Sequence, residues 1–296
     1  MLDFKNPPKR IITHPGQFHA DELLGIALIK TMIKQLGPDD HQLVVERHSV
    51  ITSEMINNKD ILLIDVGGQY DENLLNLDHH QDRLLPAACS LANTLIIRSL
   101  VHYKERIKES RYNSEYKDLH DNLEITISAL MELEAILFDY VSKVDTGIIV
   151  ENQGSATINS MMRNWNSVYT FETALEAAEA SVIWPYLDTS IKTIYDRKEF
   201  RKFMIELSTT VVSINKKKVF KGWRDVVKNE TKYLLCPNNW NENHWTLLVK
   251  DSKETKIPIT KNPQHKQIFC HNSQFLAVYE TKEGALAHLK TMGEIK

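Results

Sequence analysis

Two closely spaced groups of carboxylates and imidazoles stand out in this chain of 296 residues. Asp65 follows the apolar run at 61–64, and the triplet Asp78-His79-His80 comes thirteen residues later. A carboxylate at the end of a strand, with an acidic residue and two imidazoles nearby, supplies the oxygen and nitrogen atoms that bind divalent metals. The pattern therefore predicts a metal site.

A second donor-rich motif comes earlier in the chain. Within nine residues it contains four donor side chains, namely His14, His19, Asp21 and Glu22. Asp145, where a helical pattern ends, is a further candidate ligand. Because sites in an open parallel sheet form where strands end, we expect these groups to meet Asp65 at one edge. About six oxygen and imidazole ligands without thiolates suit manganese or magnesium better than structural zinc.

The chemistry that this set favours is hydrolysis of a phosphate ester. Asp65 is the expected bridge between two metals about 4 Å apart, because a rigid strand holds it centrally. Paired metals lower the pKa of a shared water, so that hydroxide can attack phosphorus near neutral pH. They also offset the charge of the phosphate oxygens. Asp78 is expected to orient a neighbouring imidazole from behind.

Each motif has a plainer explanation when it is taken alone. A single His at a helix start is usually a cap or a surface residue, and the chain has twelve His. Asp145 alone would more often be a solvent-exposed residue at a helix end, and His41 and His48 are interpreted as surface or strand residues. The metal-site hypothesis rests on four motifs with compatible ligand types occurring together.

The elements that must position these groups alternate between strands and helices in the first half of the chain. Expected strands are 10–14, 42–47 and 60–66, and expected helices are 21–36, 86–103 and 123–145. Residues 104–122 are dense in charge and are interpreted as a helix end followed by an exposed connection. Such alternation predicts βαβ units and a mostly parallel sheet flanked by helices.

The pattern changes after residue 170. Residues 171–210 are expected to be helical throughout and to connect two domains. Short strands are expected at 231–236, 244–250, 267–271 and 275–280, with a closing helix from 282 to about 292. We therefore expect an α/β protein with a metal-binding catalytic domain at 1–170. The remainder, 171–296, comprises the helical connection and a smaller α/β substrate-binding domain.

Composition limits the class of protein. The formal net charge of −3 gives no global electrostatic case for nucleic acid. Residues 192–228 are the exception, with eleven Lys or Arg against four Asp or Glu, a local charge of +7. This segment is interpreted either as a solvated helical face followed by a loop or as a surface that attracts phosphate.

Cysteine usage and the apolar runs bear on location. Cys89, Cys236 and Cys270 are odd in number and form no CxxC motif. This favours a reducing compartment without a disulfide framework or a thiolate zinc site. The first ten residues show no signal or transit peptide, and no apolar run approaches the roughly 18 residues that span a bilayer. We expect a cytoplasmic protein without a membrane partner, and the sequence leaves a homodimer open.

With these residues in hand, the chain resembles the melanocyte proliferating gene family of the DHH phosphoesterase superfamily, whose members are described as exonucleases acting on RNA. The family's opening THxGxFHxDE stands at 13–22, its DxGGxYD at 65–71 and its DHHQ at 78–81. A VDxxDNG-like motif begins at 144, HxSxF stands at 271–275 and TxEGAL at 281–286. The resemblance thus covers essentially the whole chain.

The resemblance implies a DHH-type catalytic domain with two divalent cations, Mn²⁺ or alternatively Mg²⁺, as cofactors. One metal would be held by His14, His19 and Asp65. The other would be held by Asp21, Asp65, His79 and Asp145. His80 would face the substrate phosphate as the catalytic or stabilising group, with Asp78 behind the imidazoles, and His271 would contact substrate.

The substrate end of the chain departs from the family pattern. Leu276 and Ala277 stand where glycines usually follow the HxSxF phenylalanine, and residues 82–85 also differ. Thr146 stands where the family usually has Asn. A Gly-rich loop exposes backbone N–H groups to phosphate, so a bulkier loop predicts an altered substrate fit.

Three functions are open at this point. The first is a manganese-dependent phosphodiesterase or exonuclease that cleaves RNA or short oligonucleotides. The second keeps the metals but takes a small phosphate ester, pyrophosphate or a cyclic dinucleotide, which the modest net charge favours. The third is a metal-stabilised binding protein without enzymatic activity, supported only by the altered loop after His271.

Overall fold

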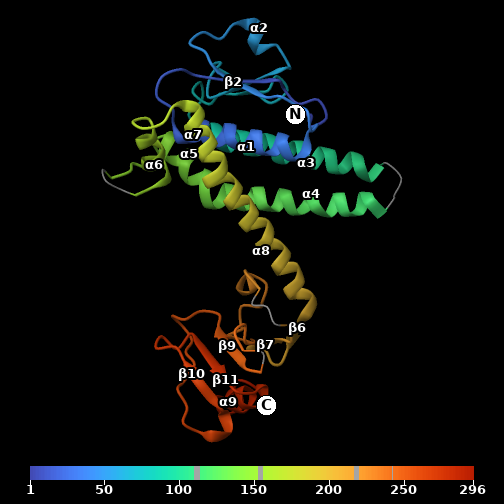
Figure 1. Cartoon of the computed structure of the whole chain (residues 1–296), viewed down its shortest axis with the longest axis vertical. Helices are drawn as coiled ribbons and strands as arrows, with labels where there is room; N and C mark the ends of the chain where they lie inside the picture. Colours follow the sequence, from blue (N-terminus) through green and yellow to red (C-terminus); the bar gives the residue numbers. More distant parts are fainter. Residues whose placement is uncertain (110–113, 153–155, 217–219, 242) are drawn as a thin grey trace. The chain divides into compact units, whose positions relative to one another are not determined.

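The computed structural model describes residues 1–109, 114–152, 156–216, 220–241 and 243–296 (Figure 1). Contacts along the chain divide it into two compact units, Met1–Ile191 and Lys192–Lys296. The first unit thus extends past residue 170 and includes helix α7 (Phe171–Ala178) and the beginning of α8 (Trp184–Phe203). Each unit has a sheet and a hydrophobic core of its own.

A five-stranded sheet with the order β2-β1-β3-β5-β4 forms the frame of the first unit. Its strands are β1 (Arg10–Thr13), β2 (Val44–Arg47), β3 (Ile61–Ile64), β4 (Tyr70–Asp71) and β5 (Asn76–Leu77). β1 pairs in parallel with β2 and β3, β3 pairs in parallel with β5, and only β4 is antiparallel. The largely parallel sheet expected from the sequence is confirmed, as are its first three strands with shorter bounds.

The central strand β3 is buried along its whole length. Helices cover one face of the sheet, while Ile12, Ile61 and Leu63 on the other face pack against apolar side chains around the short helix α2 (Ser53–Ile56). A parallel strand that is buried on both faces requires a continuous apolar run. This requirement accounts for the sequence Ile-Leu-Leu-Ile that leads to Asp65.

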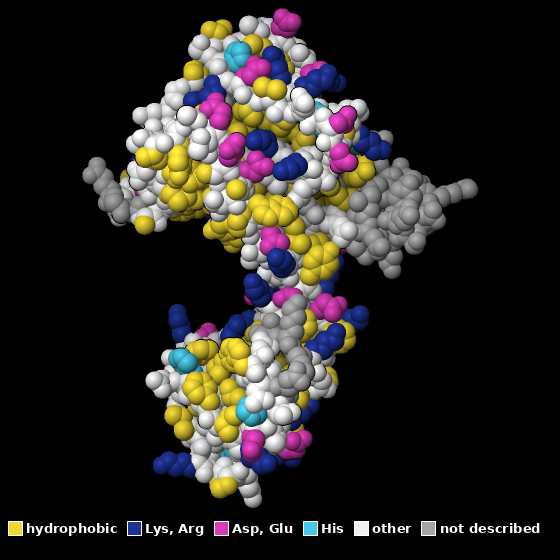
Figure 2. Space-filling view, viewed as in Figure 1, with side chains coloured by type: hydrophobic (Ala, Val, Ile, Leu, Met, Phe, Trp, Pro, Cys, Tyr) yellow, Lys and Arg dark blue, Asp and Glu magenta, His cyan; other side chains and the backbone are white. Residues whose placement is uncertain are grey.

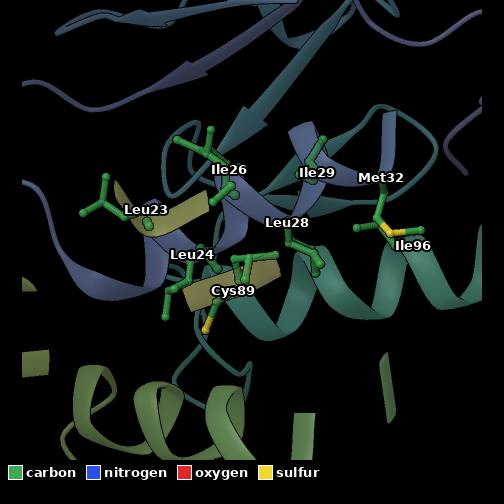
Figure 3. Close-up of a cluster of buried hydrophobic side chains, with 14 of the residues drawn as sticks. Leu23, Leu24, Ile26, Leu28, Ile29, Met32, Cys89 and Ile96 are labelled. Atoms are coloured by element: carbon green, nitrogen blue, oxygen red, sulfur yellow. The ribbon is translucent and has the colours of Figure 1, made fainter. Parts of the chain in front are cut away.

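Helices α1 (Ala20–Leu36) and α3 (Ala88–Glu109) lie side by side beneath the sheet (Figure 1). Figure 3 shows buried apolar side chains of both helices, namely Leu23, Leu24, Ile26, Leu28, Ile29 and Met32 of α1 and Cys89 and Ile96 of α3. At Gly25 an added Cβ would lie 2.7 Å from Ile64 Cδ1 and 3.3 Å from Cys89 Cα. A larger residue there would displace α1. This close packing fixes the start of α1 against the end of β3.

The helices after α3 differ in part from the sequence-based expectation. Helix α4 (Ser114–Leu133) includes 114–122 and packs against α3, so the expectation of an exposed connection over these residues is wrong. Residues 110–113 of that segment lie outside the described part. Beyond α4 a π-helical turn (Glu134–Phe138) leads into α5 (Asp139–Asp145), so the helix expected over 123–145 is interrupted once. Such π turns are often found near functional sites.

Helix α6 (Ile158–Trp165) was not expected from the sequence. Its N-cap Thr157 accepts a hydrogen bond from the backbone N–H of Ser160, and the Ser160 hydroxyl is 3.0 Å from the Thr157 nitrogen. The two residues thus form a reciprocal cap. This cap defines the start of a short helix that borders the donor-rich edge of the sheet.

The second unit contains a six-stranded sheet with the order β10-β11-β9-β8-β7-β6. Its strands are β6 (Met204–Glu206), β7 (Val211–Ile214), β8 (Tyr233–Pro237), β9 (Trp245–Val249), β10 (Gln267–Cys270) and β11 (Leu276–Tyr279). Helix α9 (Lys282–Thr291) follows the last strand. The four predicted strands and the closing helix are confirmed. The expectation of helix throughout 171–210 is wrong after Phe203, because β6 pairs with the buried strand β7.

The thiols are unpaired and mostly enclosed by protein. Cys89 and Cys236 are buried, Cys270 is half-buried, and all three are free. Burial raises the pKa of Cys236 to about 12, so that its thiol stays protonated at neutral pH. Among the described helices, none has both the length and the apolar character needed to cross a lipid bilayer.

The basic segment 192–228 is described except for residues 217–219. Three of its cations pair with carboxylates of the same segment: Arg197 with Asp225 at 2.6 Å, Lys228 with Glu206 at 3.0 Å and Lys216 with Glu199 at 3.8 Å. On the face shown in Figure 2, Lys and Arg side chains are dispersed, with acidic side chains beside several of them. Part of the local positive charge is therefore neutralised, which weakens the case for a phosphate-attracting surface.

Candidate metal centre

The carboxyl ends of β1 and β3 lie next to each other at one edge of the first sheet. These strands are parallel neighbours, with Ile12 opposite Leu63. The residues that follow them, His14 and Asp65, therefore emerge at the same edge. Helix α1 begins shortly afterwards and places Asp21 in its first turn.

Asp65 has an unusual backbone conformation. Its φ of 57° lies in the left-handed region, which costs a residue with a side chain about 1–2 kcal/mol. Gly67 and Gly68 continue the turn with φ of 115° and 72°. At Gly67 an added Cβ would lie 3.0 Å from the side-chain amide of Asn76. The fold thus accepts local strain to hold the buried Asp65 carboxylate at this point.

The His14 ring is oriented by its own loop. Its Nδ1 lies 2.9 Å from the Pro15 carbonyl oxygen, which can only accept a hydrogen bond. Nδ1 therefore carries the proton, and in the neutral ring Nε2 presents a lone pair. That Nε2 lies 2.9 Å from Glu22 Oε2 and 3.3 Å from Asp65 Oδ2. His14 is thereby aimed at the carboxylates as a ligand would be.

His79 occupies the other side of Asp65. Its Nε2 lies 3.1 Å from Asp65 Oδ1, 3.4 Å from Asp145 Oδ2 and 3.8 Å from Asp21 Oδ2. The imidazole is buried, so that these three carboxylates form its polar surroundings. His79 thus joins residues from β3, α1 and the end of α5 into one cluster.

Several converging atoms in this cluster have no hydrogen-bond partner within the described part of the chain. They are His14 Nε2, Asp21 Oδ1, Asp65 Oδ1 and His79 Nε2. Buried polar atoms are nearly always paired, and leaving one unpaired costs about 1–3 kcal/mol. Ligand atoms about 2.1 Å from an ion and at right angles to one another lie about 3 Å apart. The separations around Asp65 therefore fit divalent cations.

Three overlapping groups of side chains bring their donor atoms within 4.8 Å of one another. The groups are His14, His19 and Asp65; Asp65, His79 and His80; and His19, Asp21 and Asp145. The first group is the set predicted for one metal, and His79 brings together the four residues predicted for the other. The structure thus gathers all six predicted ligands, with Asp65 and His19 each shared between two groups.

The pKa values in this cluster favour protonation of His14, His79, Asp21 and Asp145. The neighbouring carboxylates of Asp65 and then Glu22 raise the pKa of His14 to about 11. Burial opposes ionisation of Asp65, but His14 and His79 hold its pKa down at about 2. Burial and the Asp65 charge raise the pKa of Asp21 well above its usual value, and that of Asp145 as well. Bound cations would replace the protons that these groups retain.

Asp78 and His80 form a separate pair. Asp78 Oδ2 accepts a hydrogen bond from the Gly68 N–H at 2.6 Å, and Oδ1 accepts from the His80 N–H at 3.1 Å and from His80 Nδ1 at 2.8 Å. The carboxylate of Asp78 is thus already engaged, whereas the His80 side chain is 63% exposed. Asp78 orients His80 and leaves its Nε2 free to face solvent or substrate.

Glu22 is a donor of the motif at 14–22 for which the sequence alone predicts no role. It is fully buried, and its carboxylate accepts from the Thr13 hydroxyl at 2.7 Å and from the His19 N–H at 3.3 Å. The sequence signal for this position was its place three residues after the helix N-cap. Glu22 therefore connects β1, His14 and the start of α1.

Arg47, at the end of β2, is a residue that the sequence reasoning missed. Its Nε donates to the His14 carbonyl at 2.9 Å and its Nη1 to the Gly16 carbonyl at 2.9 Å. Its Nη2 lies 3.6 Å from Glu22 Oε1. No local motif marks it, because its partners come from a different part of the chain.

His271 belongs to the second unit, at the turn between β10 and β11. Its Nδ1 accepts from the Ser273 N–H at 3.1 Å, and its ring centroid lies 4.5 Å from that of Phe275. Leu276 and Ala277, which depart from the family pattern, belong to β11, and Ala277 is buried. The contacts of His271 in the structure are those of a turn residue. Its contact with substrate stays a prediction.

Comparisons with known proteins agree with the motifs of the first unit. Residues 10–181 match the MYG1_exonuc family, described as "Uncharacterised protein family (UPF0160)". Two similar proteins are called MYG1 exonuclease, one from Homo sapiens (36% identical over 85 residues) and one from Bos taurus (35% over 85 residues). These stretches cover 29% of this chain but only 20% of each relative. Since the family match extends over more than half of the chain, this protein belongs to the MYG1_exonuc family.

Proposed function

We propose that this protein is a divalent-metal-dependent phosphodiesterase of the DHH type that acts as an exonuclease on RNA or short oligonucleotides. The family and the names of the similar proteins support a nuclease-type function. The observation that carries the proposal is the set of converging, unpaired nitrogen and oxygen atoms around Asp65. A shared carboxylate between two ligand groups is the arrangement used in two-metal hydrolysis.

The chain offers a distinct ligand set for each of two cations. His14, His19 and Asp65 would hold one. Asp21, Asp65, His79 and Asp145 would hold the other. The mixture of imidazole and carboxylate suits Mn²⁺, and Mg²⁺ is the alternative. When bound, such cations lower the pKa of water and neutralise charge on a phosphate.

The protein's own contribution is to position groups around the phosphate. Glu22 and Arg47 fix the loop and ring of His14. Asp78 holds the His80 ring by its Nδ1, so that the exposed Nε2 can contact a phosphate oxygen or give a proton to the leaving oxygen. The buried ligands exclude bulk water from one side of the site.

The test uses purified protein with Mn²⁺, labelled single-stranded RNA and bis-p-nitrophenyl phosphate. We expect stepwise release of mononucleotides and loss of activity with a chelator. Asp65→Asn keeps the size of the side chain and tolerates the left-handed backbone, but it removes the charge. We expect it to lower activity by on the order of 10²–10³-fold. Asp60→Asn is the matched control, because Asp60 lies at the other end of β3 and pairs with Lys9 on the surface.

Two results would overturn this proposal. One is a wild type that hydrolyses neither substrate with Mn²⁺ or Mg²⁺, and the other is full activity of Asp65→Asn. A wild type that binds Mn²⁺ without any turnover would instead favour a metal-stabilised binding protein.

A small phosphate substrate is a second candidate, favoured by the ion-paired charges of segment 192–228 and the net charge of −3. Salt dependence separates the two. A polymer held by about six phosphate contacts loses roughly 10³-fold in affinity between about 50 and 200 mM salt, whereas pyrophosphate or a dinucleotide loses far less. The measurement is the KM of each substrate across this range.

A further inference from the structure

A pocket of about 240 Å³ opens in the first unit, and His19, Asp21 and Asp145 line one of its sides. Its other wall is helix α6, which Asn166 fastens to the loop before α1. The Asn166 Oδ1 accepts from the Phe18 N–H at 3.0 Å, and its Nδ2 donates to the Phe18 carbonyl at 2.9 Å. This two-point contact makes the pocket a defined part of the fold.

Two hydrogen-bond donors of α6 line this pocket. Asn159 and Arg163 are four residues apart, so both lie on the same face of the helix. Asn159 is only 7% exposed, and its Nδ2 has no hydrogen-bond partner in the described part of the chain. A buried amide N–H without an acceptor destabilises the fold, and an acceptor supplied by a ligand would remove this cost. Asn159 therefore points to a ligand with oxygen acceptors.

Arg163 adds the charge that selects an anion. Its side chain is exposed, and among the described residues no carboxylate forms an ion pair with it. A guanidinium binds phosphate through two parallel hydrogen bonds. The nearby carboxylates Asp21 and Asp145 would repel an anion unless cations occupy the metal centre. The pocket is therefore suited to a phosphate once the metals are bound.

The position and size of the pocket decide which phosphate it takes. Its lining does not include Asp65, His79 or His80, so it lies beside the point where the predicted ligand sets meet. Pockets for whole ligands usually measure about 300–1,000 Å³, and this one is smaller. We propose that Arg163 and Asn159 bind the phosphate group next to the scissile one. This assignment rests on the proposed function for the class of substrate.

Binding of dinucleotides tests the assignment without requiring turnover. The ligands have an internal methylenephosphonate linkage that resists hydrolysis, and they carry a 5′ phosphate, a 3′ phosphate or no terminal phosphate. With Mn²⁺ present, we expect wild type to bind one phosphorylated form about tenfold to a hundredfold more tightly than the unphosphorylated form. Arg163→Met should abolish this preference, and Arg163→Lys should retain part of it.

Lys9→Met is the matched control, because it removes one positive charge before the start of β1, where Lys9 pairs with Asp60. It should keep the full preference for the terminal phosphate. The assignment is overturned if wild type binds neither phosphorylated form preferentially, or if Arg163→Met keeps the preference. Turnover of RNA is measured separately, so an inert wild type would count against the proposed function and not against this subsite.

Discussion

Both units contain buried histidines, but the ring nitrogens differ in whether they have hydrogen-bond partners. In the second unit His265 and His288 stack with ring centroids 4.6 Å apart. His265 Nδ1 lies 2.8 Å from the Thr260 hydroxyl and its Nε2 3.1 Å from that of Thr291, while His288 Nδ1 lies 2.8 Å from the Tyr279 hydroxyl. These nitrogens have the partners that a buried structural group needs.

In the first unit the half-buried His14 and the buried His79 face carboxylates without hydrogen-bond alignment. His14 Nε2 and His79 Nε2 are both unpaired in the described part of the chain. The pKa values also move in opposite directions: Asp65 and Glu22 raise that of His14 to about 11, whereas burial and then His265 lower that of His288 to about 4. Burial alone therefore does not mark a ligand. A candidate ligand is marked by an unpaired nitrogen atom that faces several carboxylates.

The largest effect that we expect from this difference is a response to Mn²⁺ in the first unit alone. A ligand at about 100 times its Kd stabilises the folded state by about 2.7 kcal/mol, which raises the Tm of a unit of this size by about 5–10 °C. Asp65→Asn should abolish the shift, and His288→Leu should preserve it. Calorimetry with and without Mn²⁺ measures both. A shift that survives in Asp65→Asn would break the comparison.

The second expected effect is competition between protons and metal at His14. Its pKa of about 11 means that the metal-free ring keeps its proton at neutral pH, and this stabilising contribution is lost only as the pH rises towards that value. A ligand nitrogen must be unprotonated, so metal binding releases at least one proton. The Kd for Mn²⁺ should therefore fall about tenfold per pH unit between about pH 6 and 8. Titration calorimetry with Mn²⁺ at several pH values measures this Kd. A Kd that does not change with pH would contradict the prediction.

The sequence predicted those parts of the site that are encoded locally. Asp65 follows an apolar strand, and the triplet at 78–80 combines the ligand types of one motif, so both could be recognised without a structure. Glu22 and Arg47 could not be assigned roles, because their contacts join β1, β2 and the loop after His14. Positions that act through partners distant in sequence leave no local pattern.

The fold shows the same limit. The parallel sheet followed from alternating strands and helices, whereas β6 continues a helical pattern and becomes a strand by pairing with β7. Helix α6, with Asn159 and Arg163, has a cap but no donor-rich motif to draw attention to it. His265 and His288 lie far apart in sequence and meet only in the folded second unit.

A smaller effect is expected from removing one member of the histidine pair. His288→Leu removes the hydrogen bond between the imidazole and the buried Tyr279 hydroxyl, which should destabilise the second unit by about 1–3 kcal/mol. Its affinity for Mn²⁺ should stay within about threefold of wild type, because the candidate ligands among the described residues all lie in the first unit. Urea denaturation and a Mn²⁺ titration test the two statements. A large loss of Mn²⁺ affinity would mean that the pair is not merely structural.

The smallest effect is the pH dependence of the second unit. Burial and then the neighbouring His265 lower the pKa of His288 from 6.5 to about 4, so the folded unit holds this ring neutral. Its contribution to stability is present above pH 6.5 and is lost as the pH falls towards 4, because the unfolded chain then binds a proton that the folded chain does not. Metal-free wild type should thus lose more stability over this range than His288→Leu. The carboxylates titrate equally in both proteins, so they cancel in the comparison. For each protein we measure how far the urea midpoint changes between pH 7 and pH 4.5, and the difference between the two changes reports on His288. Equal changes in the two proteins would show that the fold does not keep the ring neutral.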